Sequence, residues 1–185
     1  MIVNLTNVCC QNPIDLTDIR GVEIYLLESE CRNENSYNEI KTEKERKAFS
    51  EKYKTTTDFP IDRCAYFIDI ENCDIQKLPF LESNDIKSFD WKANKILLND
   101  SGIAKLEKLE VPLRGLAFVL NINGNNIYGG WFWNKYSSHG CDRVWTWQNP
   151  REKSLNLKFG LGGFKCGTDP RTDEKLIRNA IVNGE

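Results

Sequence analysis

Residues Gly115 to Trp147 read GLAFVLNINGNNIYGGWFWNKYSSHGCDRVWTW, and this stretch contains four of the five tryptophans and the only histidine of the chain. Within it, the apolar runs Leu116–Ile122 and Ile127–Trp133 lie on either side of Asn123-Gly124-Asn125-Asn126. Asn-Gly between two β-rich runs is the strongest short-range signal for a hairpin, because both residues accept the positive φ that a tight turn requires. Large aromatic side chains on paired strands bury much apolar surface. The hairpin is therefore predicted to nucleate the core.

The composition is that of an ordinary globular protein. Its 185 residues, 40% hydrophobic and 28% charged, suffice for a single domain with a sizeable core. The net charge is −2 and the sequence pI is about 5.6. Basic residues alternate with acidic ones over 41–47, which is typical of a solvated helix face. This charge distribution gives no reason to expect nucleic acid as a partner, and no apolar run is long enough to span a bilayer.

Alternation of apolar residues predicts further strands. In 21–27, for example, Val22, Ile24 and Leu26 fall on one face. In 154–161 the apolar residues again occupy every second position. The other predicted strands are 65–70, 95–99 and 143–148, with a short extended piece at 77–81.

Capping residues and apolar spacing predict three helices. Thr42 is followed by Glu45 at the spacing of a capping box. The helices are expected over 42–54, from Asp100 or Ser101 to about 109, and from Asp169 towards Gly184. A single turn of helix is expected at 85–91. The sum is an α+β domain, with a mostly antiparallel sheet and about three helices.

The first twenty residues are predicted to form a tether, or a shortened signal, ahead of a single domain over 21–185. Met1–Val8 is mildly apolar and runs into Cys9 and Cys10, and a cysteine just after a signal is where bacterial lipoproteins are lipidated. Two interpretations stay open. The segment is a cytoplasmic N-terminal strand with two chance cysteines, or it belongs to a lipoprotein in which Cys9 or Cys10 is modified.

Seven cysteines are many for this length, at positions 9, 10, 31, 64, 73, 141 and 166. They form no CxxC pair, and with one histidine the chain has no zinc-ligand spacing, so neither a metal nor another cofactor is expected. A reduced cytosolic protein would bury such cysteines as small hydrophobic residues. An exported protein would pair some of them, with Cys141–Cys166 and Cys31–Cys64 as two pairings to consider, although connectivity cannot be deduced from sequence.

One segment, residues 137–142 with the sequence SSHGCD, combines nucleophiles, a base and a carboxylate. His139 and Cys141 would support thiolate catalysis if the fold placed the ring nitrogen within reach of the sulfur. The glycine and the serines are equally typical of an exposed turn. The turn is the favoured interpretation.

The aromatic residues of the central stretch have two interpretations. Alternation places Trp131 and Trp133 on one face and Phe132 on the other. The indoles either form a core with Trp145 and Trp147, or they form a partly exposed surface for a protein or a flat ligand. On the second interpretation, the candidate binding residues are Tyr128, Trp131, Trp133, Tyr136 and His139.

Several phrases of the sequence resemble an uncharacterised family of small bacterial proteins, many of which look like secreted lipoproteins. The phrases are GVEIYLL at 21–27, NDIKSFDWKANKILLND at 84–100, LRGLAFVLNINGNNIYGGWFW at 113–133 with Ser137-Ser138, and GTDPRTDEKLIRNAIVNGE at 167–185. In the family pattern "YDW", "VDGE-IY-G-FW" and "DPR" phrases follow one another. Here Phe89-Asp90-Trp91 stands for the first phrase, and Asn123-Gly124-Asn125-Asn126 replaces the acidic turn. The resemblance implies a lipoprotein and brings no established activity or catalytic residues.

No stretch of the sequence fixes a reaction or a ligand. The favoured hypothesis is a non-catalytic binding domain of a lipoprotein-like protein in the periplasm or on the cell surface, with a cytoplasmic location as the alternative. The expected partner is another protein or a small ligand, with membrane contact only through a lipid anchor. One alternative is an immunity protein that neutralises a toxin. Another is a hydrolase or transferase that uses Cys141 and His139.

Overall fold

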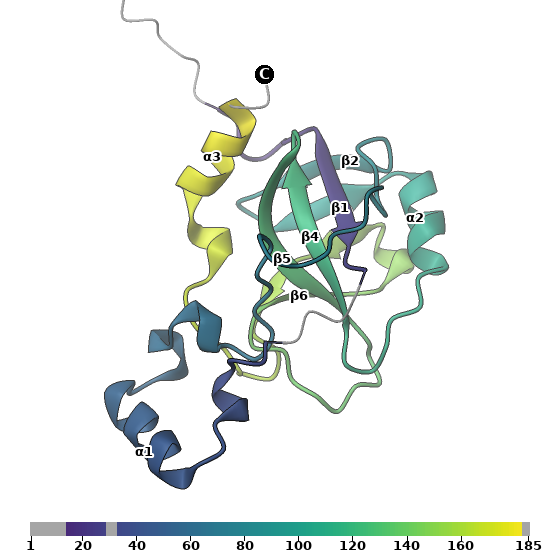
Figure 1. The fold of residues 1–185 in the computed structure, drawn as a ribbon. Coiled ribbons are helices and arrows are strands. Elements are labelled where there is room, and N and C mark those ends of the chain that lie inside the picture. The colour runs from purple at the N-terminus through teal and green to yellow at the C-terminus, as the bar shows by residue number, and fades with distance from the viewer. Residues whose placement is uncertain (1–13, 29–32, 183–185) are drawn as a thin grey trace, which may run out of the picture.

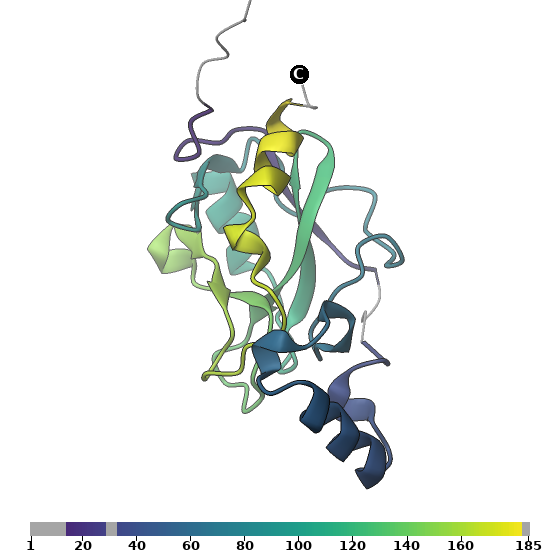
Figure 2. The same ribbon diagram turned by 90° about the vertical axis from the view of Figure 1, so that its left-hand side faces the viewer.

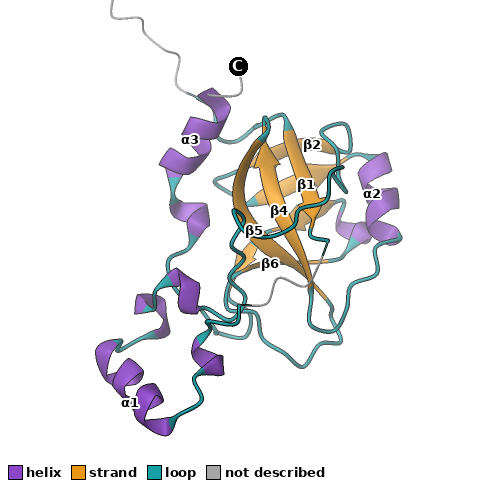
Figure 3. Ribbon diagram, viewed as in Figure 1, coloured by secondary structure: helices purple, strands orange, loops and turns teal. Residues whose placement is uncertain are grey.

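The predicted hairpin is present and lies at the centre of the larger of two sheets (Figures 1 and 3). Strands β4 (Leu116–Ile122) and β5 (Asn125–Trp133) pair antiparallel, and they are joined by a turn in which Asn123 and Gly124 have φ of 51° and 82°. These are the positive φ values that a tight hairpin turn requires. The structure is a computed structural model that describes residues 14–28 and 33–182.

The larger sheet has the strand order β1-β4-β5-β6-β8. Strand β1 (Val22–Leu26) pairs antiparallel with β4, which confirms the strand predicted at 21–27. Strand β6 (Val144–Trp147) runs parallel to β5, and β8 (Lys158–Phe159) closes the edge antiparallel to β6. The sheet is thus mostly antiparallel, as predicted, with one parallel pair.

The smaller sheet has the order β2-β3-β7, formed by β2 (Ile86–Asp90), β3 (Lys95–Leu98) and β7 (Ser154–Asn156). The helical turn predicted at 85–91 is wrong, because this segment is strand β2. The Asp85 carboxylate does not cap a following helix. It accepts a hydrogen bond from the preceding Glu82 N–H and pairs with Lys105 of the next helix, which leaves β2 free to pair with β3.

Two further strand predictions are wrong. Residues 154–161 do not form one strand, because β7 pairs with β3 in the smaller sheet and β8 pairs with β6 in the larger one. Residues 65–70 form no strand. The backbone N–H groups of Ala65 and Tyr66 donate to the Asp142 carboxylate instead of to a neighbouring strand. The extended piece at 77–81 contacts β1 through an isolated bridge between Leu81 and Ile24.

The described residues form three α-helices, as predicted: α1 (Glu43–Lys52), α2 (Asp100–Glu107) and α3 (Glu174–Val182). The Thr42 hydroxyl accepts a hydrogen bond from the Glu45 N–H and donates one to the Glu45 carboxylate, so the side chains at the capping-box positions are in contact. Helix α2 begins at Asp100, and its N-cap is Asn99 instead of the expected Asp100 or Ser101. Short 3-10 turns are η1 (Tyr37–Glu39), η2 (Thr56–Asp58), η3 (Ile61–Arg63), η4 (Pro150–Glu152) and η5 (Pro170–Thr172).

The larger sheet buries side chains on both faces. On one face Phe118 and Phe132 pack with Phe89 and Leu155 of the smaller sheet in the main core. On the other face Trp131, Trp133 and Trp145 pack with Val119 and Ile68, and Trp147 packs against them. The predicted alternation of Trp131 and Trp133 against Phe132 is therefore confirmed.

The residues just before β1 belong to the domain. We predicted a tether over 1–20, yet Leu16 and Ile19 are 2% and 3% exposed, and Ile19 forms a bridge to Phe89 of β2. Their side chains supply part of the main core, so the described part of this segment is packed and not a tether. Residues 1–13, which include Cys9 and Cys10, lie outside the described residues.

Residues 33–63, here called the arm, project from one end of the larger sheet and carry α1 (Figures 1 and 2). The Phe49 and Tyr53 rings of α1 pack within the arm, where the contacting set is Tyr37, Phe49, Tyr53 and Phe59. No residue of α1 is buried.

A disulfide between Cys64 and Cys166 fixes the base of the arm, with Cα atoms 5.5 Å apart. Both pairings considered from the sequence are therefore wrong, since each assigned one of these cysteines to another partner. Cys73 is also disulfide-bonded, and Cys141 is a free, buried thiol. None of the described helices is long and apolar enough to cross a membrane.

Candidate functional site

The structure separates the five predicted binding residues. Tyr128, Trp131 and Trp133 are 5%, 6% and 1% exposed and belong to the two cores, whereas Tyr136 is 77% exposed and His139 is also exposed. The indole N–H of Trp131 donates to the Tyr66 carbonyl oxygen, 2.9 Å away. The interpretation of the indoles as core is confirmed. Of the predicted set, only Tyr136 and His139 are left on the surface.

A cleft between the arm and the larger sheet is the site at which surface groups converge. Its main cavity is about 610 Å³. The arm contributes Tyr37, Phe59 and Arg63 to its wall, and the domain body contributes Tyr66, His139, Asp142, Phe164 and Lys165. A smaller cavity of about 270 Å³ adjoins it and shares Tyr66 and His139, with Arg114 and Trp131 in its wall. Of the predicted binding residues, His139 thus lines both cavities of the cleft, and Trp131 lines the smaller one.

The glycine-rich segment 160–167 places Phe164 in the wall of the cleft. Phe164 is 64% exposed, which is unusual for a large apolar ring. Its ring lies on Gly140, where an added Cβ would be 2.7 Å from the Phe164 Cδ2 atom. Only glycine at this position permits so close an approach. The segment therefore presents an aromatic side chain.

The basic groups of the cleft have no acidic partner in the part of the chain that the structure describes. Arg63, Arg114 and Lys165 make no ion pair with any residue that the structure describes. The Arg63 guanidinium lies 5.2 Å from the Phe49 ring, and its buried Nε–H has no described acceptor. A buried donor without an acceptor is uncommon in folded proteins. The cleft therefore offers positive charge and hydrogen-bond donors next to aromatic walls.

Among the described residues, Asp142 is the only carboxylate in the wall of the main cavity, and Glu39 is the only one in the wall of the smaller cavity. The Asp142 oxygens are already used. They accept hydrogen bonds from the Ala65 and Tyr66 N–H groups, at 2.8 and 3.0 Å. Burial raises the pKa of this carboxyl above its ordinary value, against the opposing effect of the two hydrogen bonds. Asp142 thus connects the base of the arm to the sheet and does little to offset the basic residues.

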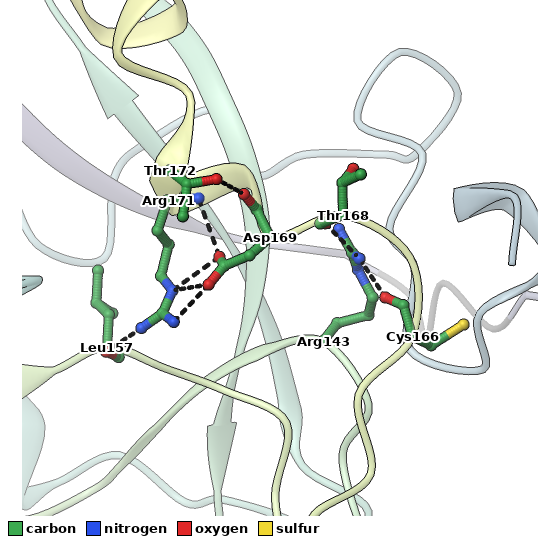
Figure 4. A network of polar contacts seen from close by, with 7 residues as sticks. All are labelled: Arg143, Leu157, Cys166, Thr168, Asp169, Arg171 and Thr172. Carbon is green, nitrogen blue, oxygen red and sulfur yellow. Dashed lines mark hydrogen bonds and ion pairs between the residues drawn. The ribbon is translucent and has the colours of Figure 1, made fainter. Parts of the chain in front are cut away.

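A polar network fixes the loop behind the cleft (Figure 4). The buried Arg143 guanidinium donates to the carbonyl oxygens of Cys166 and Thr168, at 2.5 and 2.9 Å. Beyond it, Arg171 pairs with Asp169 and donates to the Leu157 carbonyl oxygen. The Asp-Pro-Arg phrase therefore has a structural role, because it attaches the start of the last helical segment to the strands.

The described residues give little support to thiol chemistry at Cys141. The side chain is 0% exposed and its sulfur lies 3.8 Å from the Arg143 carbonyl oxygen. Burial raises the pKa of the Cys141 thiol, whereas a catalytic thiolate needs a lowered pKa. Ligand atoms of Cys64, Asp142 and Cys166 lie within 4.8 Å of one another, but the two sulfurs are joined in the disulfide and are not available as thiolate ligands.

Comparison of the chain with models of protein families, with curated proteins and with solved structures finds no match. The resemblance drawn from short phrases stays a prediction. In the structure these phrases form parts of the fold: Phe89 and Trp91 lie in the main core, and the Asp90 carboxylate accepts a hydrogen bond from the Ala93 N–H in the following turn.

Most residues of the cleft were not identified from the sequence. Arg63, Arg114 and Lys165 look like any other surface basic residues, and Tyr37 and Phe59 lie in segments without a periodic pattern. One signal was present: a phenylalanine in the glycine-rich segment 160–167, where no strand could bury it. Aromatic residues are enriched at recognition surfaces, so a phenylalanine at such a position is a candidate for recognition.

Proposed function

We propose that this protein is a binding protein of the extracytoplasmic space that holds an acidic segment of a partner protein in the cleft between the arm and the larger sheet. The observation that carries the proposal is the group of basic side chains in the cleft that have no ion pair among the described residues. It is a non-catalytic function.

The chemistry of the walls favours an acidic partner with an aromatic residue. Carboxylates of the partner would pair with Arg63, Arg114 and Lys165, and complementary charge steers association and selects the partner. An aromatic side chain would pack on Phe164, which is exposed in the free protein. Tyrosine, tryptophan and arginine are enriched in protein interfaces for these reasons.

The proposal is tested with a fluorescein-labelled peptide of eight glutamates and one tyrosine, and with a control peptide in which lysines replace the glutamates. Lys165→Glu and Arg114→Glu reverse two charges of the cleft. Lys175→Glu makes the same change at an exposed position of α3 that lines neither cavity of the cleft. We expect fluorescence anisotropy to show binding of the acidic peptide only, weakened at least tenfold by each cleft variant and unchanged by Lys175→Glu. Equal effects of all three variants would reduce the interaction to net charge and refute the cleft as the site.

The extracytoplasmic part of the proposal is supported by the Cys64–Cys166 disulfide, because disulfides persist in oxidising compartments and are rare in the cytosol of mesophiles. Alkylation of thiols in intact cells, followed by mass spectrometry, tests it. Cys64 and Cys166 are expected to escape alkylation until a reductant is added. Their complete alkylation without reductant would place the protein in a reducing compartment.

This proposal has two more specific forms. In one, the protein is anchored by a lipid at Cys9 or Cys10. In the other, the partner is a toxin. The first predicts that the mature native protein carries acyl chains on one of these cysteines, which mass spectrometry of the intact protein would detect. The second predicts that a toxin encoded by a neighbouring gene forms a complex with the protein. Such a complex should compete with the acidic peptide for the cleft.

A further inference from the structure

A second hollow, here called the groove, lies where β5 and β6 end. Its volume is about 650 Å³. It is lined by residues 133–136, which follow from β5, and by 147–151, which follow from β6. No residue of the groove lines either cavity of the cleft. The groove is therefore a separate surface, and its chemistry differs from that of an ordinary surface depression in three respects.

The first is an unpartnered donor on a residue of its wall. Trp133 is 1% exposed, and its buried indole N–H has no hydrogen-bond partner among the described residues. Buried tryptophan N–H groups usually find an acceptor, and an unpaired one lowers the stability of the folded state. Trp145 also has a buried N–H without a partner, but it does not line the groove. The two indoles therefore form a matched pair for experiment.

The second is an excess of positive charge. Lys135 and Arg151 both line the groove, no acidic residue does, and neither makes an ion pair with a described residue. The amides of the wall are engaged elsewhere: Asn134 donates to the Val111 carbonyl oxygen, and Gln148 donates to the Leu106 carbonyl oxygen. The uncommitted charged groups of the groove are thus donors that suit an anion.

The third is exposed aromatic surface. Tyr136 is 77% exposed, although its ring also contacts the Lys135 ammonium at 5.0 Å, and Trp147 is half-buried. The face of an aromatic ring carries partial negative charge and attracts the positively polarised C–H groups of a ligand. A pyranose ring presents such C–H groups on one face and hydroxyl oxygens at its edge.

We propose that the groove binds an anionic saccharide. The carboxylate of a uronic acid pairs with Lys135 and Arg151, and the C–H face of a sugar ring packs on Tyr136 or Trp147. A sugar oxygen accepts the hydrogen bond that the Trp133 N–H lacks. The proposal is independent of the partner in the cleft, since the two sites have no residue in common.

Calorimetric titration tests the proposal with a tetrasaccharide of alternating glucuronate and N-acetylglucosamine. A neutral tetrasaccharide of N-acetylglucosamine and the acidic peptide serve as comparison ligands. We expect the glucuronate saccharide to bind at least tenfold more tightly than the neutral one. The acidic peptide should not displace it from the groove. Absence of binding by the glucuronate saccharide, or equal binding of the neutral one, would overturn the proposal, and displacement by the peptide would make the groove a peptide site.

The variants Trp133→Phe and Trp145→Phe each keep an aromatic ring and remove one unpartnered N–H. Trp133→Phe is expected to weaken saccharide binding about tenfold or more, and Trp145→Phe is expected to leave it unchanged. Tyr136→Ala, at an exposed position that the fold does not need, should also weaken it several-fold. If either indole variant fails to fold, ¹⁵N NMR of the unmodified protein decides: the Trp133 indole resonance should shift on titration and the Trp145 resonance should not. Equal effects at both indoles would contradict the proposal.

Discussion

The arm and the larger sheet are built on different principles, although they are adjacent parts of one chain. The sheet buries rings completely: Phe118 and Phe132 are 0% exposed and Trp133 is 1% exposed. The arm has no fully buried apolar side chain, and its four rings contact one another at 4.7–5.9 Å in a small cluster. Burial of apolar surface is the dominant favourable term in folding. The sheet is therefore stable through its own core, whereas the arm depends on its covalent and polar attachments.

The cleft owes its properties to this difference. Its body wall belongs to a rigid sheet and to a loop fixed by Arg143, while its arm wall is joined to that loop by the Cys64–Cys166 disulfide. A binding site between a stable part and a weakly stable part adjusts to its ligand, since low-stability segments are the ones that move in recognition. The attachments at the base of the arm thus decide whether the cleft exists.

The largest effect is expected from Phe132→Ala in the sheet. Removal of a fully buried ring costs about 3–5 kcal/mol of unfolding free energy. Phe132→Ala should lower the Tm of the whole domain in calorimetry. The matched change Phe49→Ala in the arm should leave the main transition close to its original temperature. A similar fall in Tm for both variants would mean that the arm and the sheet unfold as one unit.

The next effect concerns the disulfide. Its cysteines are 102 residues apart in sequence, and a disulfide of this kind typically contributes about 2–4 kcal/mol. The double variant Cys64→Ser/Cys166→Ser should lower the midpoint of denaturant unfolding and should also abolish binding of the acidic peptide. The single change Cys141→Ala affects a free thiol and serves as the control for peptide binding. Retention of full peptide binding by the double variant would show that the cleft does not need the disulfide.

A smaller effect is expected from Asp85→Asn, which removes the ion pair between Asp85 and Lys105. Burial by itself raises the pKa of Asp85, but hydrogen bonds from Lys105 and from the Glu82 N–H outweigh it, so the pKa lies below its ordinary value. A lowered folded-state pKa gives stability that is present above the unfolded pKa of about 4 and is lost as the pH falls through the folded value. The variant should lose about 1–3 kcal/mol at pH 7, and the difference from the unmodified protein should shrink below pH 4 in denaturant titrations.

The pKa shift of Asp142, at the base of the arm, has the opposite sign to that of Asp85. Its pKa is raised by burial, so its ionised form is disfavoured in the folded state. Its contribution to stability therefore improves as the pH falls through the folded pKa towards the unfolded pKa of about 4. A contribution from Asp142 that fell in step with that of Asp85 would contradict the burial of this carboxylate.

The smallest effect is expected from Thr42→Ala at the start of α1. Loss of an N-cap residue costs about 1 kcal/mol of helix stability. Because α1 buries no residue, the loss should stay within the arm and appear as faster hydrogen exchange of α1 amides, with no change in Tm. Asp100→Ala serves as the comparison, because Asp100 lies in the first turn of α2, which packs on the main core through Leu106. A lower Tm for Thr42→Ala would indicate that the arm is coupled to the core.

Local chemistry made part of this fold predictable. The hairpin turn at Asn123-Gly124, the strand 21–27 and the capping residue Thr42 depend on neighbouring residues only, and each was identified from the sequence. The errors arose where a segment's structure is determined by a partner that is distant in sequence. Residues 65–70 form no strand because their N–H groups donate to Asp142, and 154–161 divides because its two halves pair with strands of different sheets.

The candidate sites were less predictable than the fold. An indole in an alternating strand has the same sequence pattern whether its face meets a second core or solvent, so the burial of Trp131 and Trp133 had to come from the structure. The cleft brings together residues 37–66 and 139–166, which are distant in sequence and are joined by the disulfide and the Asp142 hydrogen bonds. His139 was predicted from the sequence both as a partner of Cys141 and as a binding residue, and it lines the cleft.

Hydrogen–deuterium exchange of the oxidised protein and of the Cys64→Ser/Cys166→Ser variant compares the arm and the sheet most directly. In the oxidised protein, amides of α1 should be partly protected and those of β4 and β5 strongly protected. In the variant, we expect α1 amides to exchange within the shortest labelling time, while β4 and β5 keep most of their protection. Unchanged protection of α1 in the variant, or equal loss of protection in both regions, would contradict the dependence of the arm on its disulfide.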